Sequence, residues 1–134
     1  MPRSVRLASL VALVAFASGP CAPLSAATTV RPVPEQNKID YLIGEVKRSP
    51  ATFLRNGADH TGIRAAAHLA RKLRFAGNRV QTARDFIVGI ASNSETSGKP
   101  YEIRWPDGRR QPLAEWLTAR LALYEKEHPA TASR

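Results

Sequence analysis

Residues 101–124 read YEIRWPDGRRQPLAEWLTARLALY, and the spacing of the apolar residues changes part-way along this stretch. Over residues 101–105 apolar and charged side chains alternate, which is the period of a strand with one buried face. The turn residues Pro-Asp-Gly follow at 106–108, so we expect a β-hairpin over about 101–111. From Pro112 onward apolar residues recur every three or four positions, which predicts a helix. A hairpin is therefore expected directly before the last helix.

Three earlier helices are predicted from the same kind of spacing and from signals at their ends. They are expected over 35–48, from a cap at Asp59 or Thr61 to about Phe75, and from Thr82 to about Ala91. Gly77 suits the left-handed backbone that follows many helices, and Thr82 with Asp85 three positions later is typical of a capping box. We therefore predict a mainly α protein with a small β-hairpin (α+β), a compact four-helix domain with the hairpin inserted before the last helix.

Length and composition limit the class of protein. The chain has 134 residues, with 20 Lys and Arg against 11 Asp and Glu and a single cysteine. This length suits one small domain and excludes a multidomain enzyme. The sequence contains no Gly-x-Gly, which excludes a dinucleotide-binding fold. We expect a signal peptide over 1–27, an extended leader over 28–34, the helical domain over 35–126 and a flexible tail over 127–134.

The first residues have the layout of a secretory signal peptide. Arg3 and Arg6 precede the apolar run 7–17, and small residues follow, so we expect cleavage near Ala26 or Ala27. As a helix this run would span about 16 Å, roughly half of a bilayer's hydrocarbon core. We therefore expect an exported, periplasmic protein with no transmembrane helix in the mature chain.

Cys21 leaves a second possibility for the exported chain. A cysteine just after an apolar run is typical of bacterial lipoproteins, where it carries the lipid. Pro20 immediately before it argues against lipidation, because small residues are normally found there. If Cys21 leaves with the signal peptide, the mature domain holds no cysteine and no disulfide.

The second predicted helix carries a basic face. Residues 28–134 hold 18 Lys and Arg against 11 acids, and no acid occurs between Ile63 and Asn78. At helical spacing four basic residues of this segment share one side of the helix, opposite the apolar Ile63: Arg64, His68, Arg71 and Lys72. One interpretation is a ridge that binds phosphate or carboxylate groups. The other is a solvated face, or one paired across the fold with Glu45, Asp85 or Glu115.

Two loops are further candidates for contact with anions. Asn56-Gly57 predicts a tight turn beside Arg55, whose backbone N–H groups could form an anion-binding concavity or serve the turn alone. The polar loop Ser92–Pro100 includes Ser94 and Gly98 and ends next to Tyr101. It lacks the Gly-x4-Gly-Lys spacing of a nucleotide-binding loop, so nucleotide binding is not expected.

Several ordered segments together resemble one family. They are Phe53-Leu54-Arg55-Asn56-Gly57, His68-Leu69, Lys72-Leu73, Thr82-Ala83, Asp85-Phe86-Ile87, Ser94 and Ser97-Gly98-Lys99-Pro100-Tyr101. This pattern resembles the YfeK-like family of small exported proteins from Gram-negative bacteria, whose function is unknown. The likeness covers roughly 39–121 and implies a periplasmic, mostly helical domain. It implies no activity, substrate or catalytic residue.

The sequence favours a non-enzymatic binding or accessory protein over an enzyme. The histidines at 60, 68 and 128 do not have the spacing of metal ligands on a helix, so no metal and no cofactor are expected. The expected partner is an anionic envelope component or an acidic protein, and export makes nucleic acid an unlikely one. The alternative is a small hydrolase or ligand-binding enzyme that uses His68 and the Ser92–Lys99 loop, for which a pocket gathering Arg55, His68, Ser94 and Tyr101 would be the sign. The oligomeric state is left open.

Overall fold

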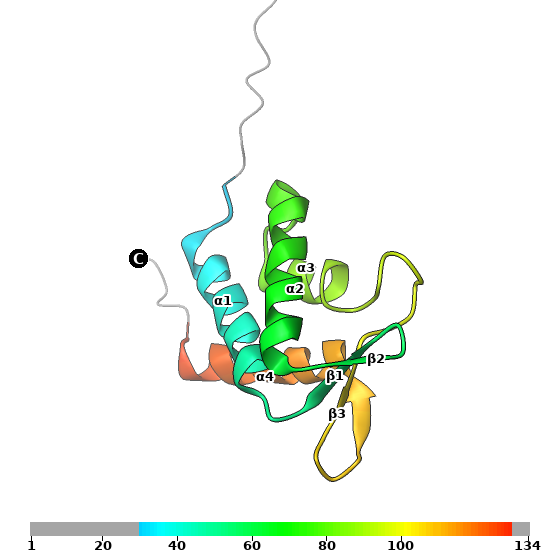
Figure 1. Cartoon of the computed structure of the whole chain (residues 1–134). Helices are drawn as coiled ribbons and strands as arrows, with labels where there is room; N and C mark the ends of the chain where they lie inside the picture. The colour runs from blue at the N-terminus through cyan, green and yellow to red at the C-terminus, as the bar shows by residue number, and fades with distance from the viewer. Residues whose placement is uncertain (1–29, 130–134) are drawn as a thin grey trace, which may run out of the picture.

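The computed structural model describes residues 30–129, and these form four α-helices, a short 3₁₀-helix and a four-stranded sheet (Figure 1). In chain order the elements are α1 (Val33–Arg48), β1 (Thr52–Arg55), β2 (Ala58–His60), α2 (Gly62–Ala76), η1 (Gly77–Arg79), α3 (Ala83–Gly89), β3 (Glu102–Arg104), β4 (Arg110–Pro112) and α4 (Leu113–Glu127). The predicted α+β class, with a hairpin before the last helix, is confirmed. The predicted signal peptide 1–27 with Cys21, the start of the leader and the end of the tail lie outside the described residues.

The helices pack around one apolar core. α1 and α2 lie side by side, and α4 runs across them, as Figure 1 shows. The largest fully buried side chains come from all four helices and from β3: Ile39, Leu42, Val46, Leu69, Phe86, Ile103, Leu117 and Leu121. Burying each of these side chains contributes about 1.5–3 kcal/mol to the free energy of unfolding. Residues 30–129 contain no cysteine, so within them the fold is stabilised by this core and not by a disulfide.

The sheet contains two hairpins, one more than predicted. β1 pairs antiparallel with both β2 and β3, and β4 completes the order β2-β1-β3-β4. The first hairpin was expected only as a short turn segment, because Phe53 and Leu54 are consecutive and both buried, which hides the alternation of a strand. The predicted tight turn is confirmed: Asn56 and Gly57 have φ of 52° and 77°, as a two-residue hairpin turn requires.

The helix ends follow the predicted signals with small differences. Thr61, not Asp59, caps α2 by accepting a hydrogen bond from the Arg64 amide, and Gly77 follows the helix with a φ of 53°. Thr82 and Asp85 form the predicted capping box. α1 begins at Val33, inside the predicted leader, because Pro at the first positions needs no N–H partner.

One apolar side chain lies on the opposite side from the prediction. Ile63 was expected on the buried side of α2, but 64% of it is exposed. Ile63 lies in the first turn of α2. In that turn it is Gly62, and not Ile63, that lies against the backbone at the end of α1. Among residues 30–129 no helix is long and apolar enough to span a bilayer.

Candidate functional site

A cavity of about 340 Å³ lies where the first half of α2 faces the sheet. Its lining is Phe53, Leu54, Arg55, His60, Arg64, Ala65, Ala67, His68, Leu69, Arg71, Tyr101, Glu102 and Leu113. This volume lies within the range of about 300–1,000 Å³ that is usual for small-molecule sites. Apolar groups therefore share the cavity wall with three arginines and two histidines.

The strand register sets one wall of the cavity. Phe53 of β1 pairs with His60 of β2 on one side and with Ile103 of β3 on the other, so these three share a face of the sheet. Arg55 and Tyr101 stand two positions along from Phe53 and Ile103 and therefore lie on that same face. This is the face that α2 covers, and it brings Arg55 and Tyr101 to the helix.

The other wall is one face of α2. Arg64, His68 and Arg71 are spaced by four and three residues, so they line up along the helix. Of these, Arg64 and Arg71 are exposed, whereas His68 is half-buried. The basic residues of this face thus run along the cavity from one rim to the other.

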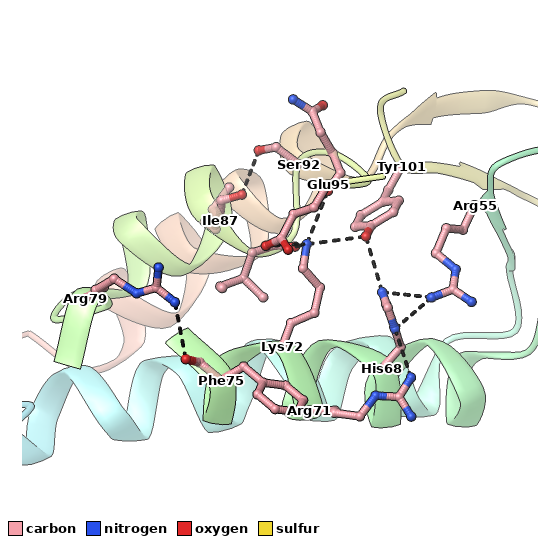
Figure 2. A network of polar contacts seen from close by, with 12 residues as sticks. Arg55, His68, Arg71, Lys72, Phe75, Arg79, Ile87, Ser92, Glu95 and Tyr101 are labelled. Carbon is pink, nitrogen blue, oxygen red and sulfur yellow. Dashed lines mark hydrogen bonds and ion pairs between the residues drawn. The ribbon is translucent and has the colours of Figure 1, made fainter. Parts of the chain in front are cut away.

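His68 is the centre of the polar contacts in the cavity (Figure 2). Arg55 Nη1 lies 2.7 Å from its Nδ1, Arg71 Nη2 lies 3.3 Å from the same atom, and Tyr101 Oη lies 3.2 Å from its Nε2. Burial, followed by the electrostatic effects of Arg55, Lys72 and Arg71, lowers the pKa of His68 to about 4. At neutral pH the imidazole is therefore uncharged.

The three arginines of the cavity have no acidic partner among the residues that the structure describes. Within residues 30–129, no ion pair joins Arg55, Arg64 or Arg71 to a carboxylate. Glu102 lines the cavity, but its carboxylate accepts a hydrogen bond from Arg110 at 2.7 Å. Glu45, Asp85 and Glu115, the acids considered as partners for α2, do not pair with it. The cavity therefore carries a net positive charge.

Lys72 is not part of a solvent-facing ridge, which corrects the prediction for this residue. Its side chain is only 11% exposed, and its ammonium group donates to the carbonyl oxygens of Ile90 and Asn93 at 2.9 and 3.2 Å. It also donates to Tyr101 Oη at 3.3 Å, as Figure 2 shows. The loop after α3 folds over this part of α2, and Lys72 satisfies its carbonyl groups.

The other predicted residues lie outside the cavity. Ser94 is buried in the polar loop, where its backbone N–H donates to Lys99 and its carbonyl accepts from Gly98. Gly98 has a φ of 68° and serves the turn of that loop. Asn56 is exposed at the hairpin tip and accepts a hydrogen bond from Ser97. The structure thus brings Arg55, Arg64, His68, Arg71 and Tyr101 together, but not Asn56, Ser94 or Gly98.

His60 is a cavity residue that sequence analysis did not select as a site residue. Its Nε2 is buried and has no hydrogen-bond partner within the described residues. A buried polar atom without a partner costs about 1–3 kcal/mol, which makes this nitrogen a candidate contact for a ligand. Its pairing opposite Phe53 depends on the first hairpin, which the sequence did not reveal.

The side chains of the cavity determine which ligands it can contact. Within residues 30–129, no group of three or more His, Cys, Asp or Glu side chains lies close enough to hold a metal ion. A planar guanidinium donates two parallel hydrogen bonds to a carboxylate or phosphate. Three such groups around one cavity suit an anionic ligand.

Residues 33–125 match the DUF5329 family, a family of unknown function. This chain belongs to that family. It is 38% identical over 68 residues to the uncharacterized protein YfeK of Salmonella typhimurium (strain LT2). The similar segment covers 50% of this chain and 57% of that protein, so the chain matches somewhat more than half the length of this relative. The predicted YfeK-like resemblance is confirmed, and no solved structure matches.

Proposed function

We propose that this DUF5329 protein is a non-enzymatic binding protein of the cell envelope, and that its ligand presents carboxylate or phosphate oxygens to the cavity. The observation that carries the proposal is the group of three arginines, Arg55, Arg64 and Arg71, which line one cavity with no carboxylate paired to any of them within residues 30–129. Positive charges gathered in a partly buried site repel one another, and an anion relieves that repulsion.

The state of His68 supports the same proposal. Because the pKa of this imidazole is about 4, it is a neutral hydrogen-bond group at neutral pH and a weak general base. Its Nδ1 lies within 2.7 Å of the Arg55 guanidinium and 3.3 Å of the Arg71 guanidinium, and these contacts orient the two arginines along the cavity. Its role in the proposal is to hold these two arginines for the ligand.

A hydrolase is the weaker proposal. A nucleophile has to lie within about 3 Å of its base, and Ser94 is buried in a loop outside the cavity that holds His68. The cavity residues include no serine, threonine or cysteine. Binding without catalysis therefore accounts better for the group of side chains present.

Export to the periplasm is the second part of the proposal. The support for it is the sequence of residues 1–27, with two arginines, an apolar run and small residues near Ala26. An envelope location brings the cavity close to lipid phosphates, acidic polysaccharides and acidic proteins. Any of these carries the charge that the arginines select.

Ligand-dependent stability tests the binding proposal. Inorganic phosphate and acetate are each compared with chloride at equal ionic strength, and the thermal unfolding midpoint is followed by circular dichroism. A ligand that binds only the folded state raises this midpoint by mass action. We expect phosphate or acetate to raise it in the wild type and not in Arg64→Ala/Arg71→Ala.

The matched control removes two arginines elsewhere. Arg74 and Arg84 are exposed and do not line the cavity, so Arg74→Ala/Arg84→Ala changes the net charge equally. This variant is expected to respond to the anions as the wild type does. An identical response in all three proteins would refute the cavity as the anion site.

Cell fractionation tests the export proposal. The chain is produced in a Gram-negative host, and the mass of the protein released from the periplasm is measured. Loss of the residues up to Ala26 or Ala27 is expected. A product that begins at Cys21 with an added lipid mass, or an unprocessed cytoplasmic chain, would contradict a soluble periplasmic protein.

A further inference from the structure

The cavity holds an apolar surface as well as its charges. Leu54, Leu69 and Leu113 are each 9% exposed or less, and they line the cavity together with Phe53 and Ala65. Leu54 pairs with Asp59 and Glu102, so its side chain lies on the other face of the sheet from Phe53, and Leu69, Leu113 and Phe53 supply the apolar surface under α2. A site for a bare inorganic ion needs no such surface, because an ion gains nothing from contact with apolar groups.

The charged and apolar groups lie at different depths. Arg64 and Arg71 are exposed and form the rim on α2, whereas Leu69, Leu113 and Phe53 are buried and form the floor. A ligand with an acidic group at one end and an apolar body would meet both surfaces at once. The volume, about 340 Å³, equals that of roughly eleven liquid waters at about 30 Å³ each, enough for a short chain or one or two rings.

Resting on the proposed anion-binding function, we propose that the ligand is a small amphipathic anion. Its carboxylate or phosphate head lies against Arg64 and Arg71, and its apolar body covers the leucines of the floor. His60, whose buried Nε2 has no partner within residues 30–129, offers one further polar contact inside the same wall. The ligand class is thus a fatty acid, an aryl acid or an alkyl phosphate rather than a polymer.

Three matched probes separate the head from the body. Octanoate carries both parts, acetate carries the head alone and octanol carries the body alone. Trp116 packs edge-on against Phe53, with ring centres 6.5 Å apart, so tryptophan emission reports occupancy of the floor. Affinities are measured from this emission and by calorimetry on the mature chain.

The expected order follows from burial and charge. Each methylene removed from water raises affinity by roughly fourfold, so octanoate should bind at least about tenfold tighter than acetate. Octanoate should also bind at least about tenfold tighter than octanol, since an ionic hydrogen-bonded head contributes more than about 1.4 kcal/mol. Octyl phosphate, measured in parallel, decides whether a carboxylate or a phosphate head fits better.

Variants connect each part of the ligand to its surface. Arg64→Ala/Arg71→Ala should weaken octanoate binding about tenfold or more and leave octanol unchanged. Ala65 is half-buried in the cavity wall, so Ala65→Leu places a larger side chain in the space above the apolar floor. This variant should weaken the binding of octanoate and leave the binding of acetate unchanged. Ala122→Leu makes the same change at an exposed position of α4 and should have no effect. Unfolding curves of all variants verify that each one is folded.

The two proposals fail in different ways. If acetate and octanoate bind equally well and both depend on Arg64 and Arg71, the amphipathic ligand is refuted while anion binding stands. If octanol binds as tightly as octanoate, or if none of the four probes binds, both proposals are refuted. Equal octanoate binding by wild type and Ala65→Leu would also overturn the assignment of the floor.

Discussion

Lys72 Nζ lies 3.3 Å from the hydroxyl oxygen of Tyr101 and 5.2 Å from the centre of the Tyr101 ring. The ammonium group therefore supports the residue that in turn contacts His68, with 3.2 Å between Tyr101 Oη and His68 Nε2. Through these contacts the loop after α3, α2 and the start of β3 form one polar layer beside the cavity (Figure 2). Lys72 belongs to the framework of the site and not to its solvent-facing charge.

Replacing Lys72 with Met should destabilise the fold. The change leaves the part-buried carbonyl oxygen of Ile90 without its donor, and an unsatisfied buried polar group costs about 1–3 kcal/mol. Urea unfolding of Lys72→Met should show a loss of this size. Arg74→Met, an exposed change on the same helix, should stay within about 0.5 kcal/mol of the wild type. Equal stabilities would show that the ammonium contacts contribute nothing.

The lowered pKa of His68 predicts a loss of stability in mild acid. The pKa is about 4 in the folded state against 6.5 for the free side chain, so between these values the unfolded chain binds a proton that the folded chain does not. The free energy of unfolding should therefore fall as the pH is lowered from about 6.5 to about 4. Glu35 adds to this loss at lower pH. Burial raises the pKa of its carboxyl, but hydrogen bonds from Lys38 and Ala83 outweigh burial and lower that pKa below the usual 4.5. The stability that the ionised Glu35 contributes is therefore lost as the pH falls below 4.5.

Two measurements check this pH dependence. Urea unfolding between pH 7 and pH 4.5 should show a shallower decline for His68→Gln than for the wild type. Nuclear magnetic resonance of the His68 ring should place its titration midpoint near 4, and a bound anion beside Arg55 and Arg71 should raise that midpoint. A midpoint near 6.5 without any anion would contradict the crowded, partly buried site.

The helices and their ends could be predicted because their signals are local. The Thr82 capping box and the glycine after α2 need only a few neighbouring residues, and the structure has both. The strand β1 could not be predicted in this way. Its two central residues, Phe53 and Leu54, point to opposite faces of the sheet and are both buried, so apolar and polar residues do not alternate along it. Its position inside the sheet depends on pairing with β3, about fifty residues later in the chain, as well as with the neighbouring β2.

The candidate site was predicted in part, for a similar reason. Helical spacing alone groups Arg64, His68 and Arg71 on one face of α2. The same spacing places Lys72 with them, but the loop from Ile90 to Asn93 folds over its end of the face and turns the ammonium group inward. Neither the position of His60 nor the cavity itself follows from local spacing, because both arise where the first hairpin meets α2.

The Asn56-Gly57 turn should tolerate few substitutions, although it is exposed. Gly57 has a φ of 77°, and an added Cβ would meet no atom within 4 Å, so the cost of a side chain comes from the backbone alone. Gly57→Asn should cost least, Gly57→Ala about 1–2 kcal/mol and Gly57→Val more, because branched side chains disfavour this backbone most. Urea midpoints give the order, and equal midpoints would contradict the left-handed turn that positions Arg55.

Gly62 should tolerate no side chain at all, for a steric reason. A Cβ at Gly62 would overlap with the carbonyl oxygen of Val46 and lie 3.2 Å from those of Lys47 and Ser49, so the first turn of α2 would have to move away from α1. Backbone atoms cannot yield as a flexible side chain does, and we expect Gly62→Ala to cost at least about 2–3 kcal/mol by analogy with overpacked cores. Gly89→Ala is the matched control, since its Cβ meets nothing within 4 Å at a helical position, and it should stabilise the protein by up to about 1 kcal/mol. Calorimetric melting of the two variants should therefore move in opposite directions, and a Gly62→Ala protein as stable as the wild type would show that α1 and α2 are further apart than described.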